Sequence, residues 1–91
     1  MLLERMNKGN KDIYKSTRIV SESIRIALED YFENMEGYAP DNLYALVLQE
    51  VEKPIFEVTL GHCSGNQSKA AKFLGVSRGT LRKKMKLYEI G

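Results

Sequence analysis

Apolar residues recur every three or four positions over residues 20–35, the spacing of one face of a helix. Ser21 is a candidate N-cap for this helix, and Gly37 is a candidate stop signal. The polar and basic residues before it include glycine and asparagine, which interrupt any periodic pattern. We therefore predict a first helix here, preceded by a flexible basic arm over residues 1–18.

A second helical pattern follows a short connection at residues 38–40. Asp41 or Asn42 can cap this second helix, which we expect to reach His62. Pro54 lies inside it and removes one backbone hydrogen bond, so the helix should bend there without ending.

The second predicted helix is apolar on two faces. One face carries the apolar positions Leu43, Leu46, Val47, Val51, Ile55 and Val58, and the other carries Tyr44, Leu48, Phe56 and Leu60. This is more apolar surface than one neighbouring helix covers. A second subunit is the natural cover, because a chain of 91 residues buries only a modest share of its own surface.

The last 26 residues change to two short helices separated by a tight turn. Asn66 and Ser77 are candidate N-caps, and Gly75 provides the left-handed conformation that such a turn requires. Ala71 permits the two helices to cross closely. The inward positions are expected at Leu74, Val76, Leu81, Met85 and Tyr88. This pattern is typical of a helix-turn-helix.

The net charge of +2 hides a strong polarity along the chain. Residues 1–19 carry five basic and two acidic side chains, residues 20–65 carry two and nine, and residues 66–91 carry seven and one. A polyanion is thus attracted to the C-terminal segment and repelled by the middle. No apolar stretch is long enough for a membrane span or a signal peptide, so we expect a cytoplasmic protein without a membrane partner.

The predicted second helix of the helix-turn-helix presents a cationic face that suits duplex DNA. Arg78 can donate two hydrogen bonds to guanine, and Thr80 can contact a thymine methyl group. Lys84 and Lys86 are compact charges on flexible stems and suit phosphates. Asn66 and Ser68 can hold another phosphate at the start of the preceding helix.

The stretch GNQSKAAKFLGVSRGTLRKKMKLY resembles the DNA-binding end of the Fis family, the factors for inversion stimulation. The resemblance continues upstream through Asn42-Leu43-Tyr44 and Glu50-Val51-Glu52 and covers about residues 19–91. It implies an all-α fold of four helices. The first two form an intertwined homodimer core over residues 19–65, and the last two form a DNA-binding unit over residues 66–91.

The resemblance also implies a function. Fis-like proteins are nucleoid-associated homodimers that bind degenerate duplex sites, bend the DNA, and influence transcription, recombination and chromosome organisation. The implied DNA contacts are Asn66, Ser68, Lys69, Ser77, Arg78, Thr80, Arg82, Lys83, Lys84 and Lys86, with Arg78 and Lys83 as base readers. We expect the subunit interface to include Val47, Val51, Pro54, Ile55 and Val58.

The sequence departs from the family pattern at three places. Ser77 stands where asparagine is expected, and Leu87 stands where lysine is expected. The N-terminal segment is short and does not match the hairpin arm that activates DNA invertases. The short N-terminal segment therefore calls recombinase activation into question. A recombinase and RNA polymerase are the candidate protein partners.

Two other classes of function compete with this interpretation. The C-terminal domains of sigma-54-dependent activators carry the same motif, although the phosphate-binding loop of their ATPase domain is absent here. A helical interaction module that does not bind DNA explains the two-faced helix but not the basic terminus. An enzyme fits poorly, because His62 and Cys63 are the only residues of their types. We expect no catalytic residue, metal or cofactor.

Overall fold

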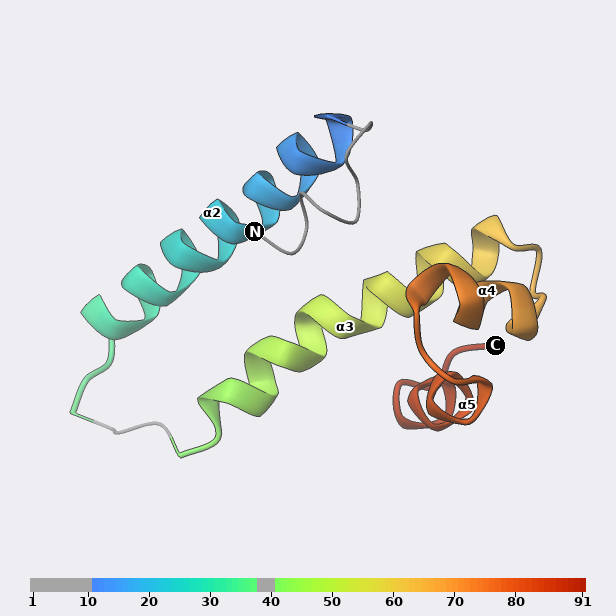
Figure 1. Cartoon of the computed structure of the whole chain (residues 1–91). Coiled ribbons are helices and arrows are strands. Elements are labelled where there is room, and N and C mark those ends of the chain that lie inside the picture. Colours follow the sequence, from blue (N-terminus) through green and yellow to red (C-terminus); the bar gives the residue numbers. More distant parts are fainter. Residues whose placement is uncertain (1–10, 38–40) are drawn as a thin grey trace. The chain divides into compact units, whose positions relative to one another are not determined.

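The computed structural model describes residues 11–37 and 41–91, and all regular structure in these residues is helical (Figure 1). The helices are α2 (Lys11–Glu33), α3 (Leu43–His62), α4 (Gln67–Leu74) and α5 (Arg78–Leu87). Over the described ranges, the predicted all-α fold with four helices is confirmed. The chain divides into two compact units, Met1–Asp41 and Asn42–Gly91.

Helix α2 begins earlier than the apolar pattern predicts. The interpretation of residues 11–18 as weakly structured is wrong, because they form the first turns of α2. Ser21 therefore lies inside the helix and is not its N-cap. No glycine or proline interrupts the chain between Lys11 and Glu33, so the helix propagates through mostly polar residues that add little to the apolar pattern. The remainder of the predicted arm, residues 1–10, lies outside the described residues.

The end of α2 uses a side chain in place of the predicted glycine. The Asn34 side-chain amide donates to the Asp30 carbonyl and to its carboxylate, at 2.8 and 3.2 Å. The Asp30 carbonyl also accepts from the Asn34 backbone N–H at 3.1 Å, so Asn34 binds the last turn through both its backbone and its side chain. Gly37 does adopt a positive φ of 87°, but it lies four residues beyond the last helical residue.

No described side chain of α2 is buried. Ile24 and Leu28 are half-buried, whereas Ile19, Ile26 and Phe32 are exposed. A helix with an apolar stripe obtains most of its stability from covering that stripe. The apolar side chains of α2 are therefore left without a core of their own.

Helix α3 has the predicted bounds and continues through Pro54. The predicted bend at Pro54 stays a prediction. Asn42 occupies the N-cap position, but its side chain makes no capping hydrogen bond. The connection predicted at residues 38–40 lies outside the described residues.

The core of the second unit corrects one prediction about α3. Phe56 and Leu60, which we assigned to a second subunit, are buried within their own chain by α4 and α5. The buried cluster also contains Cys63, Ala70, Ala71 and Leu81. Other α3 side chains stay uncovered, with Tyr44 80% and Val58 70% exposed. The chain's own helix-turn-helix thus covers only one end of the apolar surface of α3.

This packing joins α3 to the helix-turn-helix in one compact unit, Asn42–Gly91. The predicted domain boundary between residues 65 and 66 therefore differs from the boundary between the two compact units, which lies between residues 41 and 42. The division of the chain into a dimerisation part and a DNA-binding part at residue 65 stays a proposal. Within the described ranges, no helix is both long and apolar enough to cross a membrane.

Candidate nucleic-acid interface

Helix α4 begins at the predicted cap. The Asn66 side-chain oxygen accepts a hydrogen bond from the Lys69 backbone N–H at 3.1 Å. This bond satisfies one of the four N–H groups that the first turn leaves without a partner. The start of α4 is therefore held in place directly after the end of α3.

The turn between α4 and α5 is closed by Gly75 as predicted. Gly75 has φ 73° and ψ 29°, the left-handed conformation, and the N–H of Val76 donates to the Ala71 carbonyl. This is the Schellman arrangement, in which the residue after the glycine then packs on the helix. Val76 accordingly packs against the core. Turn and core together set the direction in which α5 leaves.

Helix α5 begins at Ser77, the second predicted cap. The Ser77 hydroxyl accepts from the Thr80 backbone N–H at 3.0 Å and donates to the Thr80 hydroxyl at 3.0 Å. Serine at this position is thus an ordinary capping residue. The departure from the family's asparagine leaves the helix start intact.

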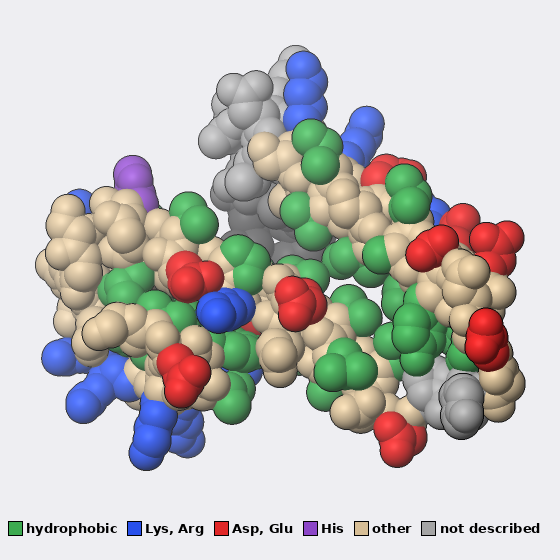
Figure 2. Space-filling model, turned by 180° about the vertical axis from the view of Figure 1, so that it is seen from behind, with side chains coloured by type: hydrophobic (Ala, Val, Ile, Leu, Met, Phe, Trp, Pro, Cys, Tyr) green, Lys and Arg blue, Asp and Glu red, His purple; other side chains and the backbone are tan. Residues whose placement is uncertain are grey.

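Helix α5 separates an apolar face from a cationic one. Leu81 is fully buried, and Met85 and Tyr88 pack against the same core, as predicted. Outside this apolar face, the exposed residues of α5 include Arg78, Thr80, Arg82, Lys83 and Lys86. Residues four apart on a helix share a face, so three of these cations form one row. Figure 2 shows lysine and arginine side chains gathered along the lower edge of the C-terminal unit.

The residues predicted at the start of α4 are also exposed, namely Asn66, Ser68 and Lys69. The Lys69 ammonium lies 5.8 Å from the centre of the Phe73 ring. This is within cation–π range, although an exposed contact of this kind is weak. The structure thus exposes every predicted DNA contact except Lys84. Leu87, the second position at which the sequence departs from the family pattern, is 65% exposed and brings an apolar side chain to the surface.

Lys84 differs from the other cations of α5. Its ammonium lies 2.7 Å from a Glu52 carboxylate oxygen, and the Tyr88 hydroxyl donates to the same oxygen at 2.6 Å. Lys84, and then Tyr88, lower the pKa of Glu52 by hydrogen bonding to the ionised carboxylate. The same carboxylate raises the pKa of Lys84 and the pKa of Tyr88.

Sequence reasoning missed the contact that Glu52 makes with α5. Glu52 lies 36 positions before Tyr88, so no local spacing could have paired the two side chains. It also missed Ala70, which is fully buried beside Ala71. The small residue type was the available signal there, because an Ala-Ala pair permits close packing on two sides of a helix.

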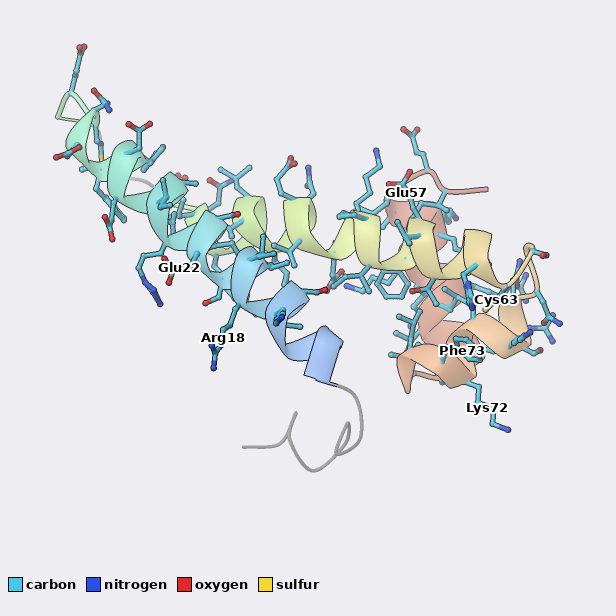
Figure 3. All side chains as sticks on the ribbon, turned by 90° about the horizontal axis from the view of Figure 1, so that it is seen from above. Arg18, Glu22, Glu57, Cys63, Lys72 and Phe73 are labelled. Atoms are coloured by element: carbon cyan, nitrogen blue, oxygen red, sulfur yellow. The ribbon has the colours of Figure 1, made fainter. Side chains whose placement is uncertain are left out.

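His62 and Cys63 do not form a joint site. Cys63 is buried in the core, where Figure 3 shows it between the end of α3 and the start of α4. His62 is exposed, and its ring centre lies 5.7 Å from that of Phe73. Among the described residues, no group of three or more histidine, cysteine, aspartate and glutamate side chains is arranged to hold a metal ion.

Comparisons with known proteins agree with this geometry. The profile described as "Bacterial regulatory protein, Fis family" matches residues 47–88, from within α3 to the end of α5. The chain is similar to the "DNA-binding protein Fis" of Glaesserella parasuis, with 42% identity over 82 residues, 90% of this chain and 84% of that protein.

Two further relatives show the same relationship. The "Putative Fis-like DNA-binding protein" of Pseudomonas aeruginosa is 46% identical over 69 residues, 76% of this chain and 66% of that protein. The "DNA-binding protein Fis" of Psychromonas ingrahamii is 45% identical over 74 residues, 81% of this chain and 75% of that protein. The similarity therefore extends well beyond the helix-turn-helix.

Proposed function

This chain belongs to the Fis family of bacterial regulatory proteins, and on that basis we propose that it binds double-stranded DNA as a homodimer and bends it. The family comprises DNA-binding regulators and not enzymes, and the relatives are named for DNA binding. We propose that the protein is associated with the nucleoid in the cytoplasm. There it regulates transcription, recombination and chromosome organisation, with a recombinase and RNA polymerase as candidate protein partners.

One observation carries the proposal: an exposed row of cations lies on a helix whose opposite face is fixed in a core. Arg78, Arg82 and Lys86 are exposed while Leu81 is fully buried. A solvated charged helix needs no such anchoring, whereas a recognition helix must be held rigidly to enter the major groove. The acidic middle of the chain keeps the duplex away from the other helices.

The side chains divide between base reading and phosphate binding. We propose that Arg78 donates two hydrogen bonds to a guanine and that Lys83 contacts a neighbouring base. Arg82 and Lys86 contact phosphates. Phosphate contacts at the start of α4 come from Asn66, Ser68 and Lys69. The Ser77 hydroxyl already donates to the Thr80 hydroxyl and accepts from the Thr80 backbone N–H, so Ser77 contributes packing against the bases more than hydrogen bonds.

The uncovered apolar surface supports the homodimer. Ile55 and Val58 are exposed on α3, and Ile19 and Ile26 are exposed on α2. Covering such side chains stabilises an assembly by about 25 cal/mol for each Å² of apolar surface. We propose that a second copy covers them, with Val47, Val51, Pro54, Ile55 and Val58 at the interface.

The dimer accounts for bending. Two recognition helices that are held closer than one turn of DNA can enter successive major grooves only if the duplex bends and its central minor groove narrows. Part of the sequence preference then comes from base pairs that the protein does not touch.

The test is a titration of a duplex with the protein at several salt concentrations. The logarithm of the binding constant should fall linearly with the logarithm of salt concentration, with a slope of about −0.9 for each phosphate contact. Arg78→Ala should cost about 1–3 kcal/mol at preferred sites and relax the sequence preference. Lys86→Ala should weaken binding to all duplexes alike.

Lys72→Ala is the matched control, because it removes the same charge from an α4 side chain that projects away from α3 (Figure 3). It should leave affinity nearly unchanged. Binding that does not depend on salt, or equal losses in all three variants, contradicts the proposed interface.

A further inference from the structure

Glu52 joins the recognition helix to the helix before it. One carboxylate oxygen of this α3 residue receives hydrogen bonds from two α5 groups, the Lys84 ammonium at 2.7 Å and the Tyr88 hydroxyl at 2.6 Å. The two donors are four residues apart, so the carboxylate holds two successive turns of α5. The side chains of Glu52 and Lys84 are only 20% and 29% exposed.

The geometry makes Lys84 a poor phosphate ligand. Its ammonium already neutralises a carboxylate, and a phosphate that approached it would come close to a second anion. The neighbouring cations Lys83 and Lys86 are exposed. Hydrogen bonds from Lys84 and Tyr88 favour the ionised carboxylate, so the contact is intact near neutral pH.

The contact also connects two proposed roles. Glu52 lies between Val51 and Pro54 on α3, among the residues that we assign to the subunit interface. A hydrogen-bonded clamp between α3 and α5 transfers the orientation of the interface helix to the recognition helix. Hydrogen bonds between ionised groups are directional when they are this short. They therefore fix the angle between α3 and α5 more tightly than apolar packing alone.

We propose that Glu52 is a positioning residue for DNA recognition, which acts through Lys84 and Tyr88 to set the angle of α5, and that Lys84 is not a phosphate contact. This inference rests on the proposed DNA-binding function. It removes Lys84 from the contacts that the family resemblance implies.

The first test is the sign of the effect of Glu52→Gln, measured on a duplex that the protein has selected from a randomised pool. The substitution removes a negative charge and keeps the side-chain shape. If Glu52 only repelled DNA and held Lys84 back from a phosphate, the variant would bind more tightly and with a steeper salt slope. We expect the opposite, a loss of about threefold to tenfold in affinity for the selected duplex. Affinity for a scrambled duplex should change little.

The second test compares two lysines. Lys86→Gln should reduce the salt slope by about 0.9, because a phosphate contact is lost. Lys84→Gln should leave the slope unchanged and reduce the preference for the selected duplex. The double variant Glu52→Lys/Lys84→Glu should recover most of the affinity that Lys84→Glu loses. A phosphate ligand cannot be rescued in this way, because glutamate at position 84 repels the backbone.

Tyr88→Phe removes one hydroxyl and keeps the ring in the core, so it provides the same test if the charge-swapped chain does not fold. It should show a smaller loss in the same direction. Tighter binding by Glu52→Gln, or a reduced salt slope in Lys84→Gln, overturns the positioning role alone. Absence of salt-dependent binding by the wild-type protein overturns the proposed function and this inference with it.

Discussion

Helix α2 and the three-helix unit α3–α5 both carry apolar faces, but only the second buries a part of its apolar surface in a core of its own. In α2, every described side chain is exposed or half-buried. In the second unit, Leu81, Ala70 and Phe56 come from three helices and share one core. The difference teaches that the helix-turn-helix packs within one chain, whereas α2 and part of α3 keep apolar side chains exposed, which we propose a second copy covers.

The largest expected effect is in the core of the three-helix unit. Leu81→Ala removes a fully buried side chain and should lower the free energy of unfolding by about 2–5 kcal/mol. Urea unfolding followed by circular dichroism measures this loss. The matched change in α2, Ile26→Ala, should have an effect that grows as the protein is diluted, because we propose that a second copy covers this exposed side chain. If Ile26→Ala lowers the free energy of unfolding equally at all protein concentrations, the proposed difference between α2 and the three-helix unit is contradicted.

The turn between α4 and α5 should give the next largest effect. Gly75→Ala forces a side chain into a left-handed conformation, at φ 73°, and should cost about 1–2 kcal/mol. No atom lies within 4 Å of the added carbon, so the cost is conformational and not steric.

Gly79→Ala is the control in the same motif. Gly79 has ordinary helical geometry, and the nearest atom to the added carbon is the Ser77 hydroxyl oxygen at 3.9 Å. Alanine should therefore raise the free energy of unfolding by up to about 1 kcal/mol. If the backbone approaches DNA at this position, the same variant binds a duplex more weakly. Destabilisation by Gly79→Ala contradicts this account of the turn.

Removal of either cap should have a smaller effect. Asn66→Ala and Ser77→Ala each delete a side-chain acceptor for one backbone N–H and should each cost about 1 kcal/mol. Asn42→Ala is the matched control, because its side chain makes no capping bond. Thermal unfolding of the three variants measures the difference. Equal losses at all three positions contradict the roles of Asn66 and Ser77.

The smallest effect is on the acid side of the stability curve. The pKa of Glu52 is lowered below its ordinary value of 4.5 in the folded protein. Its stabilising contribution is therefore present above pH 4.5 and is lost as the pH falls through the lowered pKa. Glu52→Gln should flatten this part of the curve, whereas Glu57→Gln, on the same helix and exposed, should not. If the free energy of unfolding falls with pH in the same way in the wild-type protein and in Glu52→Gln, the contact of an ionised Glu52 with Lys84 and Tyr88 is contradicted.

Local chemistry was readable from the sequence in the helix-turn-helix. Asn66, Gly75 and Ser77 act within a few residues of themselves, so their roles follow from spacing alone. The bounds of α3 followed from its long apolar pattern in the same way.

Two features could not be read in this way. The first turns of α2 are mostly polar, with Ile13 and Tyr14 as their apolar residues, so the start of the helix carries little periodic signal. The contact of Glu52 with Lys84 and Tyr88 joins residues that only the folded chain brings together. The early start of α2 and the ion pair of Lys84 were therefore both missed, because the local sequence pattern gives no information about either.

Sedimentation equilibrium of the whole chain, alone and with a short duplex, tests the central claim most directly. The account predicts a mass of twice 10.4 kDa at micromolar concentration without DNA, and one such dimer on each duplex. A monomer of 10.4 kDa that binds the duplex singly would contradict it, because the exposed apolar faces of α2 and α3 would then have no second copy to cover them.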